Sequence, residues 1–176
     1  MKAIFIPGNG GGKTTENWFP YVQRGLEKLG IEVIAAEFPD PDLARARYWL
    51  PFLKELGADE QTILIGHSSG ALATMRYAET HKIFGSVLVG VAHTDGGDPK
   101  ERASGYFSTP WDWDAIKKNQ KWIIAFHSVD DPYIQVSEAR YVAEMLDADY
   151  HEFQNRGHFF PADDFSELVD AISEKL

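Results

Sequence analysis

The sequence contains no cysteine, no long apolar run and comparatively few basic residues. The absence of cysteine excludes a disulfide scaffold, a thiolate zinc site, an iron–sulfur cluster and a cysteine nucleophile. No stretch approaches the ~18 apolar residues that a membrane-spanning helix needs. The apolar run Ala3–Ile6 is also shorter than the ~7-residue minimum of a signal-peptide core. We therefore expect a soluble, cytoplasmic protein.

The charge balance is acidic: 17 Lys and Arg face 27 Asp and Glu, for a net charge of −10 with histidine neutral. An acidic chain repels phosphate backbones and anionic membrane surfaces, so neither a nucleic-acid partner nor a membrane partner is expected. With 44% hydrophobic and 13% aromatic residues, the chain has enough apolar surface to fold. Its 176 residues suit one domain spanning positions 1–176.

Short apolar runs alternate along the chain with longer amphipathic stretches, which predicts an α/β fold with a mainly parallel sheet covered by helices on both faces. The last helix is expected to start at Pro161–Asp164, and the longest stretch without periodicity is Ala92–Trp113. The expected strands are Ala3–Ile6, Ile31–Ala36, Thr62–Ile65, Ser86–Val91, Trp122–Phe126 and Tyr150–Phe153. Apolar stripes at helical spacing lie within residues 19–29, 50–56, 72–77, 142–146 and 165–172. Functional residues in such sheets lie just after the strands, at the carboxyl edge.

The sharpest motif is Gly66-His67-Ser68-Ser69-Gly70, a G-x-S-x-G pattern between an apolar strand and a helical run. This context predicts a nucleophile elbow, a tight turn that exposes the side chain of Ser68. The N–H of Ser69, at the start of the following helix, is placed to stabilise an oxyanion. By strand alternation, His67 should point away from the nucleophile.

A serine nucleophile needs a histidine base, and His158 is the favoured candidate because it follows the last strand. His127, at a strand end, is a weaker competitor, while His151 lies inside a strand and His81 closes a helix. The base in turn needs an orienting acid. The candidates are Asp131, Asp130 and Asp95 in that order, and spacing alone does not separate the first two.

The first strand runs into a glycine-rich loop, Pro7–Thr15. It misses the phosphate-loop pattern G-x-x-x-x-G-K-[ST] by one position, so ATP or GTP binding is the less favoured interpretation. In a hydrolase, this loop supplies the second oxyanion donor, here the N–H of Asn9 or Gly10.

Several aromatic residues follow strands or loops near the expected site, and they predict a pocket that prefers an apolar or aromatic group. A purely structural role for these side chains is equally compatible with the sequence. The histidines are scattered and no H-E-x-x-H motif is present, so no metal site is expected. The pocket candidates are Trp18, Tyr106, Phe107, Trp111 and Phe159.

Segments across nearly the whole chain resemble the small α/β-hydrolases grouped with retinoblastoma-binding protein nine. The resemblance implies a lidless, six-stranded serine hydrolase that needs no cofactor, with Ser68, Asp131 and His158 as its triad. The matching segments are Pro7–Gly12, Pro39–Pro41, Gly66–Gly70, Met75–His81, Glu101–Phe107, Pro110–Trp113, Asp130–Pro132 and Gly157–Phe159.

The family takes its name from binding to the retinoblastoma protein, which is associated with an L-x-C-x-E motif. The corresponding segment here, Leu56–Glu60, has Ala58 in place of cysteine, so we expect no retinoblastoma-protein binding through it. The expected activity is hydrolysis of a small ester or amide through an acyl-enzyme. The alternative is a non-catalytic interaction module that keeps the elbow for packing.

Overall fold

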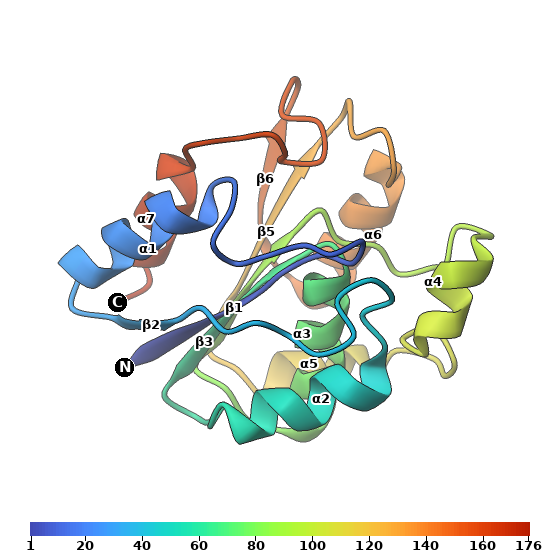
Figure 1. The fold of residues 1–176 in the computed structure, drawn as a ribbon, viewed down its shortest axis with the longest axis horizontal. Helices are drawn as coiled ribbons and strands as arrows, with labels where there is room; N and C mark the ends of the chain where they lie inside the picture. Colours follow the sequence, from blue (N-terminus) through green and yellow to red (C-terminus); the bar gives the residue numbers. More distant parts are fainter.

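A six-stranded parallel sheet in the order β2-β1-β3-β4-β5-β6 runs through the centre of the computed structural model, which describes residues 1–176 (Figure 1). Parallel strands must be joined by crossover connections, and helices supply most of them here. The carboxyl ends of all six strands therefore lie on one edge of the sheet. The strands are β1 (Lys2–Ile6), β2 (Glu32–Ile34), β3 (Thr62–His67), β4 (Gly85–Val89), β5 (Ile123–Ser128) and β6 (Asp149–Phe153).

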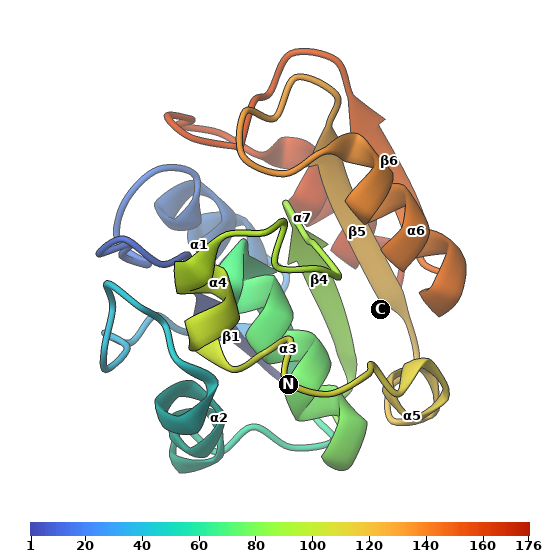
Figure 2. The ribbon, with the colours of Figure 1, turned by 90° about the vertical axis from the view of Figure 1, so that its right-hand side faces the viewer.

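The helices form a layer on each face of the sheet, as the two perpendicular views show (Figures 1 and 2). Helices α1 and α7 cover one face, while α2, α3, α5 and α6 cover the other. Helix α4 lies outside both layers. The bounds are α1 (Phe19–Lys28), α2 (Ala46–Glu55), α3 (Ser69–Thr80), α4 (Pro99–Ser104), α5 (Trp113–Lys118), α6 (Val136–Leu146) and α7 (Ser166–Ser173).

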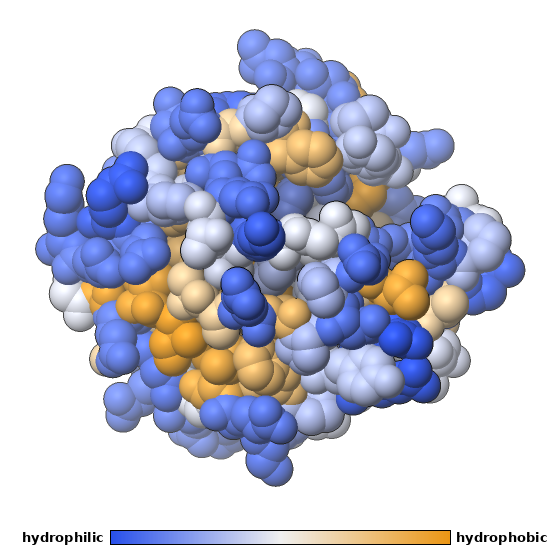
Figure 3. Space-filling model, in the orientation of Figure 1, coloured by the Kyte–Doolittle hydropathy of each residue, from blue (hydrophilic) through white to orange (hydrophobic).

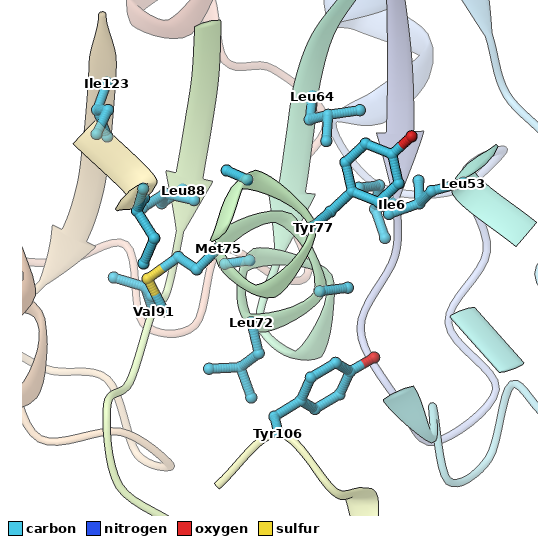
Figure 4. Close-up of a cluster of buried hydrophobic side chains, with 14 of the residues drawn as sticks. Ile6, Leu53, Leu64, Leu72, Met75, Tyr77, Leu88, Val91, Tyr106 and Ile123 are labelled. Atoms are coloured by element: carbon cyan, nitrogen blue, oxygen red, sulfur yellow. The ribbon is translucent and has the colours of Figure 1, made fainter. Parts of the chain in front are cut away.

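The two layers enclose two apolar clusters, which explains why most residues of the central strands are apolar. Every residue of β3, β4 and β5 is buried, because helices cover both sides of these strands. The larger cluster of 23 residues surrounds α3. In Figure 4, Leu72 and Met75 of this helix extend toward Tyr106 and Val91.

The edge strand β2 is short, and none of its residues is fully buried. A short edge strand limits pairing with other chains. On the face shown in Figure 3, apolar residues gather over the region of β2 and α2, and hydrophilic residues cover most of the remainder. None of the helices combines the length and apolar character needed to cross a membrane.

The structure has a strand at each of the six expected places, although β2 is shorter than the run that predicted it. Two short helices, α4 and α5, fall where no helical periodicity is visible. Each begins after an aspartate whose carboxylate accepts a backbone N–H, Asp98 from Lys100 and Asp112 from Ala115. The expected start of the last helix was wrong, because α7 begins at Ser166 and Pro161–Asp164 form a loop before it.

Candidate active site

Ser68 occupies the turn between β3 and α3, as the G-x-S-x-G pattern predicts. Its backbone has φ 55° and ψ −117°, a left-handed conformation that a residue with a Cβ adopts only at an energetic cost. A side chain at Gly66 would collide with the carbonyl of Gly70, and one at Gly70 with the carbonyl of Ile6. The Ser68 N–H donates to the Val89 carbonyl at 2.8 Å, which ties the turn to the end of β4. These contacts hold the turn in its strained conformation.

His158 and Asp131 come from the loops after β6 and β5, and their side chains meet. The Nδ1 of His158 donates to Oδ2 of Asp131 at 2.6 Å, and the Asp131 side chain is fully buried. Its second oxygen accepts the N–H groups of Tyr133 and Ile134 at 2.9 and 3.0 Å. Both carboxylate oxygens are therefore occupied, which fixes the carboxylate and the imidazole ring bonded to it.

The environment of Asp131 keeps it ionised. Burial alone would raise the pKa of this carboxyl, but the hydrogen bond and charge of His158 and the two backbone N–H groups together lower it. The ionised carboxylate and the imidazole of His158 therefore face each other in a buried setting.

The two rival acids have other partners. Asp130 is exposed, and its Oδ1 accepts from the Ser128 hydroxyl at 2.6 Å and from the Gly157 N–H at 2.9 Å. Asp95 pairs with Arg102 at 2.7 Å. The geometry thus separates Asp131 from Asp130, which spacing alone does not.

Ser68 and His158 line the same cavity, which has a volume of about 960 Å³. The His158 ring packs over Gly90, where an added Cβ would lie 3.0 Å from its Cε1 atom. Gly90 directly follows Val89 at the end of β4, and the Val89 carbonyl accepts the Ser68 N–H, so the ring and Ser68 lie at the same strand end. No hydrogen bond joins the Ser68 hydroxyl to His158, and Nε2 has no partner within the chain. In serine hydrolases without substrate this contact is often loose and tightens when substrate binds.

The expectation for His67 was wrong: its ring does not point away from the site. It lines the cavity, lies 4.8 Å from the His158 ring and donates from Nε2 to the His158 carbonyl at 2.8 Å. Alternation fails here because the chain leaves the strand geometry at the next residue, Ser68. Burial and the neighbouring His158 lower the pKa of His67 to about 3, so the ring is neutral at pH 7.

The remaining histidines lie away from the nucleophile. His127 is fully buried behind Asp131, 3.9 Å from its carboxylate, and donates to the Ile134 carbonyl at 3.1 Å. His81 stacks on Tyr77, and His151 stacks on Phe126.

The glycine-rich loop after β1 packs directly against the elbow. A Cβ added to Gly8 would lie 3.3 Å from the Cβ of Ser68. Of the two oxyanion donors left open by the sequence, the Gly10 N–H already donates to the Asp42 carbonyl at 3.1 Å, whereas the Asn9 N–H has no acceptor in the chain. The Asn9 side chain is fixed separately, because its amide donates to Glu101 at 2.7 Å.

This loop does not have the form of a phosphate-binding loop. In a phosphate-binding loop, the helix begins at the Gly-Lys-Ser/Thr end, so that its N-terminus faces the phosphate. Here Gly12-Lys13-Thr14 is followed by turns, and α1 begins only at Phe19. The structure therefore offers no support for nucleotide binding at this loop.

Most of the predicted pocket aromatics lie elsewhere. Trp18, Tyr106 and Phe159 are at most 1% exposed and belong to the core (Figure 4 for Tyr106). Trp111 packs under the guanidinium of Arg76, 3.7 Å from its ring centre. These four were wrong as lining residues, because an aromatic after a loop packs into the core as readily as around a ligand. Phe107 does line the cavity.

Phe160, an aromatic residue beside the proposed base in the sequence, lines the cavity, and so do Tyr133 and Glu101, which sequence reasoning did not single out as site residues. Both lie at segments that resemble the family, since Tyr133 directly follows Asp130–Pro132 and Glu101 opens Glu101–Phe107. Their position at these segments was the only available signal. Burial raises the pKa of Glu101, while its hydrogen bond from Asn9 opposes that rise.

Comparisons with known proteins identify the family to which the chain belongs. The model of the serine hydrolase family matches residues 3–173. The chain is 49% identical to the serine hydrolase RBBP9 of Rattus norvegicus, over 99% of this chain and 95% of the rat protein.

Solved structures share the fold at lower identity. The ydeN gene product of Bacillus subtilis has a TM-score of 0.85 at 24% identity, covering 99% of this chain and 98% of that one. Est1E of Butyrivibrio proteoclasticus, solved with ferulic acid bound, has a TM-score of 0.73 at 17% identity, covering 99% and 87%. The family match and the identity to the rat protein show that this chain is an α/β-hydrolase of the serine hydrolase family, among the small members related to RBBP9.

Proposed function

We propose that the protein hydrolyses a small ester or amide by acyl transfer through Ser68, with His158 as the base and Asp131 as the acid that orients it. The observation that carries this proposal is the 2.6 Å contact between His158 and Asp131 beside a strained elbow serine in the same cavity. A loop that merely closed the fold would not need a buried carboxylate aligned on an imidazole whose other nitrogen is free.

The mechanism follows from these positions. The Ser68 hydroxyl attacks the substrate carbonyl while His158 Nε2 accepts its proton. The Ser69 N–H, in the first turn of α3, and the Asn9 N–H, unpaired within the chain, are the donors that stabilise the resulting oxyanion. His158 then gives the proton to the departing alcohol or amine as the acyl–heteroatom bond breaks. Water, activated by the same imidazole, releases the acid from Ser68.

Fluorophosphonate labelling tests the proposal, because this probe reacts with activated serines only. We expect the wild-type protein to be labelled and Ser68→Ala not to be. The matched control is Ser69→Ala, which removes the adjacent hydroxyl but keeps the backbone N–H, and it should still be labelled.

A wild-type protein that resists labelling would contradict the mechanism and favour a non-catalytic interaction module on the hydrolase fold. Labelling that persists in Ser68→Ala would place the nucleophile elsewhere. Once labelling is established, a screen of ester, thioester and aminoacyl substrates would identify the preferred acyl bond.

A further inference from the structure

Two aromatic side chains at the mouth of the cavity are unusually exposed. Tyr133 is 69% exposed and Phe160 is 43% exposed, although both rings are large enough to gain from burial. They come from different loops, after β5 and before α7, yet their rings stack at 5.9 Å with an interplanar angle of 26°. Both line the cavity that contains Ser68. We refer to this Tyr133–Phe160 pair as the aromatic rim.

The aromatic rim packs directly on the proposed base. The Tyr133 ring lies 5.2 Å from the His158 ring, and the Phe160 ring lies 5.5 Å from it, both edge-to-face. Phe160 also meets His67 edge-to-face at 6.1 Å. The rim is therefore in contact with the imidazole of the proposed base.

The local backbone holds both rings in place. The Tyr133 N–H donates to Oδ1 of Asp131 at 2.9 Å, so the rim is anchored on the same carboxylate that orients His158. Phe159 adopts φ 58°, a strained value for a residue of its size, and its ring is buried against Phe165 at 5.1 Å. This conformation directs two successive phenylalanines to opposite places, Phe159 into the core and Phe160 to the cavity mouth.

The chemistry indicates which part of a substrate the rim would contact. His158 must give its proton to the leaving group, so the leaving oxygen or nitrogen lies within about 3 Å of Nε2. A group attached to that atom therefore lies beside the imidazole, within reach of the two rings that pack on it.

From this arrangement we propose that Tyr133 and Phe160 form a leaving-group subsite that selects substrates whose departing alcohol or amine carries a planar aromatic or similarly flat apolar group. The inference rests on the proposed function and adds to it the substrate class. A flat group inserted against the rim would cover aromatic surface that is otherwise in water, and the gain would be realised in the transition state as well as on binding.

The test separates the two halves of the ester. Benzyl acetate and methyl acetate share an acyl group and have alcohols of similar acidity, so their ratio of kcat/KM reports recognition of the leaving group. Methyl phenylacetate against methyl acetate reports recognition of the acyl group. Because kcat/KM covers the steps up to acylation, the common deacylation step does not mask the difference.

We expect Phe160→Ala and Tyr133→Ala each to lower the benzyl-to-methyl ratio about tenfold, within the range for an apolar pocket contact. Tyr133→Phe should retain the ratio, since the ring makes the contact and the hydroxyl makes no hydrogen bond. The control is Tyr48→Ala, which removes a tyrosine that is 42% exposed and lies against Arg45 and Arg47. It should leave the ratio unchanged.

Three results would overturn the inference. An unchanged benzyl-to-methyl ratio would mean that the rim binds no leaving group. A change confined to the phenylacetate arm would place the acyl group there. An equal loss on all esters, accompanied by slower fluorophosphonate labelling, would make the rim a support for His158. Failure of the proposed function itself would be seen separately, as absence of labelling in the wild-type protein.

Discussion

The elbow and the region around Arg76 differ in how sequence and structure are related. The elbow rests on a short and widespread pattern, yet its strained serine faces the cavity. The region around Arg76 contains the two longest segments that carry the resemblance to the family, Met75–His81 and Glu101–Phe107, yet Arg76 is buried away from the cavity and only the two ends of the second segment line it.

Arg76 shows what these longer segments contribute to the fold. Its guanidinium, 8% exposed, donates to the carbonyls of Tyr106, Thr109 and Pro110 at 2.5–3.2 Å and pairs with Glu79 at 2.7 Å. The ring of Trp111 lies against its face. One side chain thus holds a loop that has little regular structure, and this requires several residues at once.

The comparison shows that the length of a matching sequence segment does not indicate whether the segment carries the reaction chemistry. Reaction chemistry needs few side chains, provided that the backbone places them, so its pattern is short. Fixing an irregular loop requires many mutually dependent contacts, so its pattern is long. Substitutions in the two regions should therefore separate activity from stability.

The largest effect is expected for Ser68→Ala, which should lower turnover by about a millionfold, as loss of the nucleophile does in other serine hydrolases. The folded state should be unaffected, because a small, partly exposed hydroxyl that faces the cavity contributes little packing. Ser68→Gly should be equally inactive but about 1 kcal/mol more stable, since it relieves the strain at φ 55°. Turnover of an activated ester and urea unfolding measure the two quantities. A stable but active Ser68→Ala would contradict the mechanism.

Asp131→Ala should follow, with a loss of about ten-thousandfold, because the acid orients and stabilises His158 without itself reacting. The matched control is Asp130→Ala, which removes an exposed neighbour bonded to Ser128 and Gly157. It should change stability and turnover little, because solvent screens the contacts of an exposed carboxylate. Measurements at saturating ester, with melting temperatures compared, distinguish the two. A larger loss of turnover in Asp130→Ala would mean that Asp130 is the acid.

In the region around Arg76, we expect a loss of stability in place of a loss of activity. Arg76→Ala should lower the free energy of unfolding by about 3–5 kcal/mol. The substitution leaves the partly buried Glu79 without its cationic partner and removes the donor from three carbonyls. Arg76→Lys should recover part of this, because an ammonium cannot reproduce the planar fork of donors. Urea unfolding gives the size of the effect. Fluorophosphonate labelling at low temperature should persist, and its complete loss in a folded variant would show that Arg76 also supports the site.

The same distinction explains which parts of the fold and of the candidate site could be predicted from the sequence. The buried strands are recognisable because continuous apolar runs are needed between two helical layers. Ser68 and His158 are recognisable because the chain order and the strand ends limit where such residues can lie, whereas spacing leaves Asp131 and Asp130 as alternatives and only the resemblance to the family favours Asp131. The positions of Ser68, Asp131 and His158 in the structure agree with that expectation, while their catalytic roles await the experiments above.

The remaining features depend on three-dimensional packing that no local pattern records. Whether Trp18 or Phe160 faces a cavity is decided by elements distant in the chain. His67 turns toward the site because the backbone leaves strand geometry at one residue. Helices α4 and α5 are six residues each, too short to show a periodic apolar stripe. The Asn9 N–H could be preferred to the Gly10 N–H as an oxyanion donor only once the structure showed that the Gly10 N–H donates to the Asp42 carbonyl.

The smallest expected effect concerns the pH dependence of stability at His67. Burial first, and then the nearby His158, lower the pKa of His67 from 6.5 to about 3 in the folded protein. Between these values the unfolded chain binds a proton that the folded chain does not. The stability that depends on neutral His67 is therefore complete above pH 6.5 and is lost as the pH falls toward 3. One proton corresponds to about 1.4 kcal/mol per pH unit, or about 2 kcal/mol between pH 7 and pH 5.

His67→Gln isolates this contribution, because the glutamine amide can still donate to the His158 carbonyl but does not titrate. Other groups, including the buried His127, also change with pH, so the informative quantity is the difference between the wild-type and variant slopes. Urea unfolding at pH 7 and pH 5 should show about 2 kcal/mol less acid destabilisation in His67→Gln, whatever its stability at pH 7. His81→Gln, which alters a histidine at the partly exposed end of α3, should keep the wild-type slope. If the free energy of unfolding changed equally between pH 7 and pH 5 in His67→Gln and wild type, the His67 ring would be protonated at pH 5 in the folded protein. The cavity beside His158 would then be more hydrated than its geometry indicates.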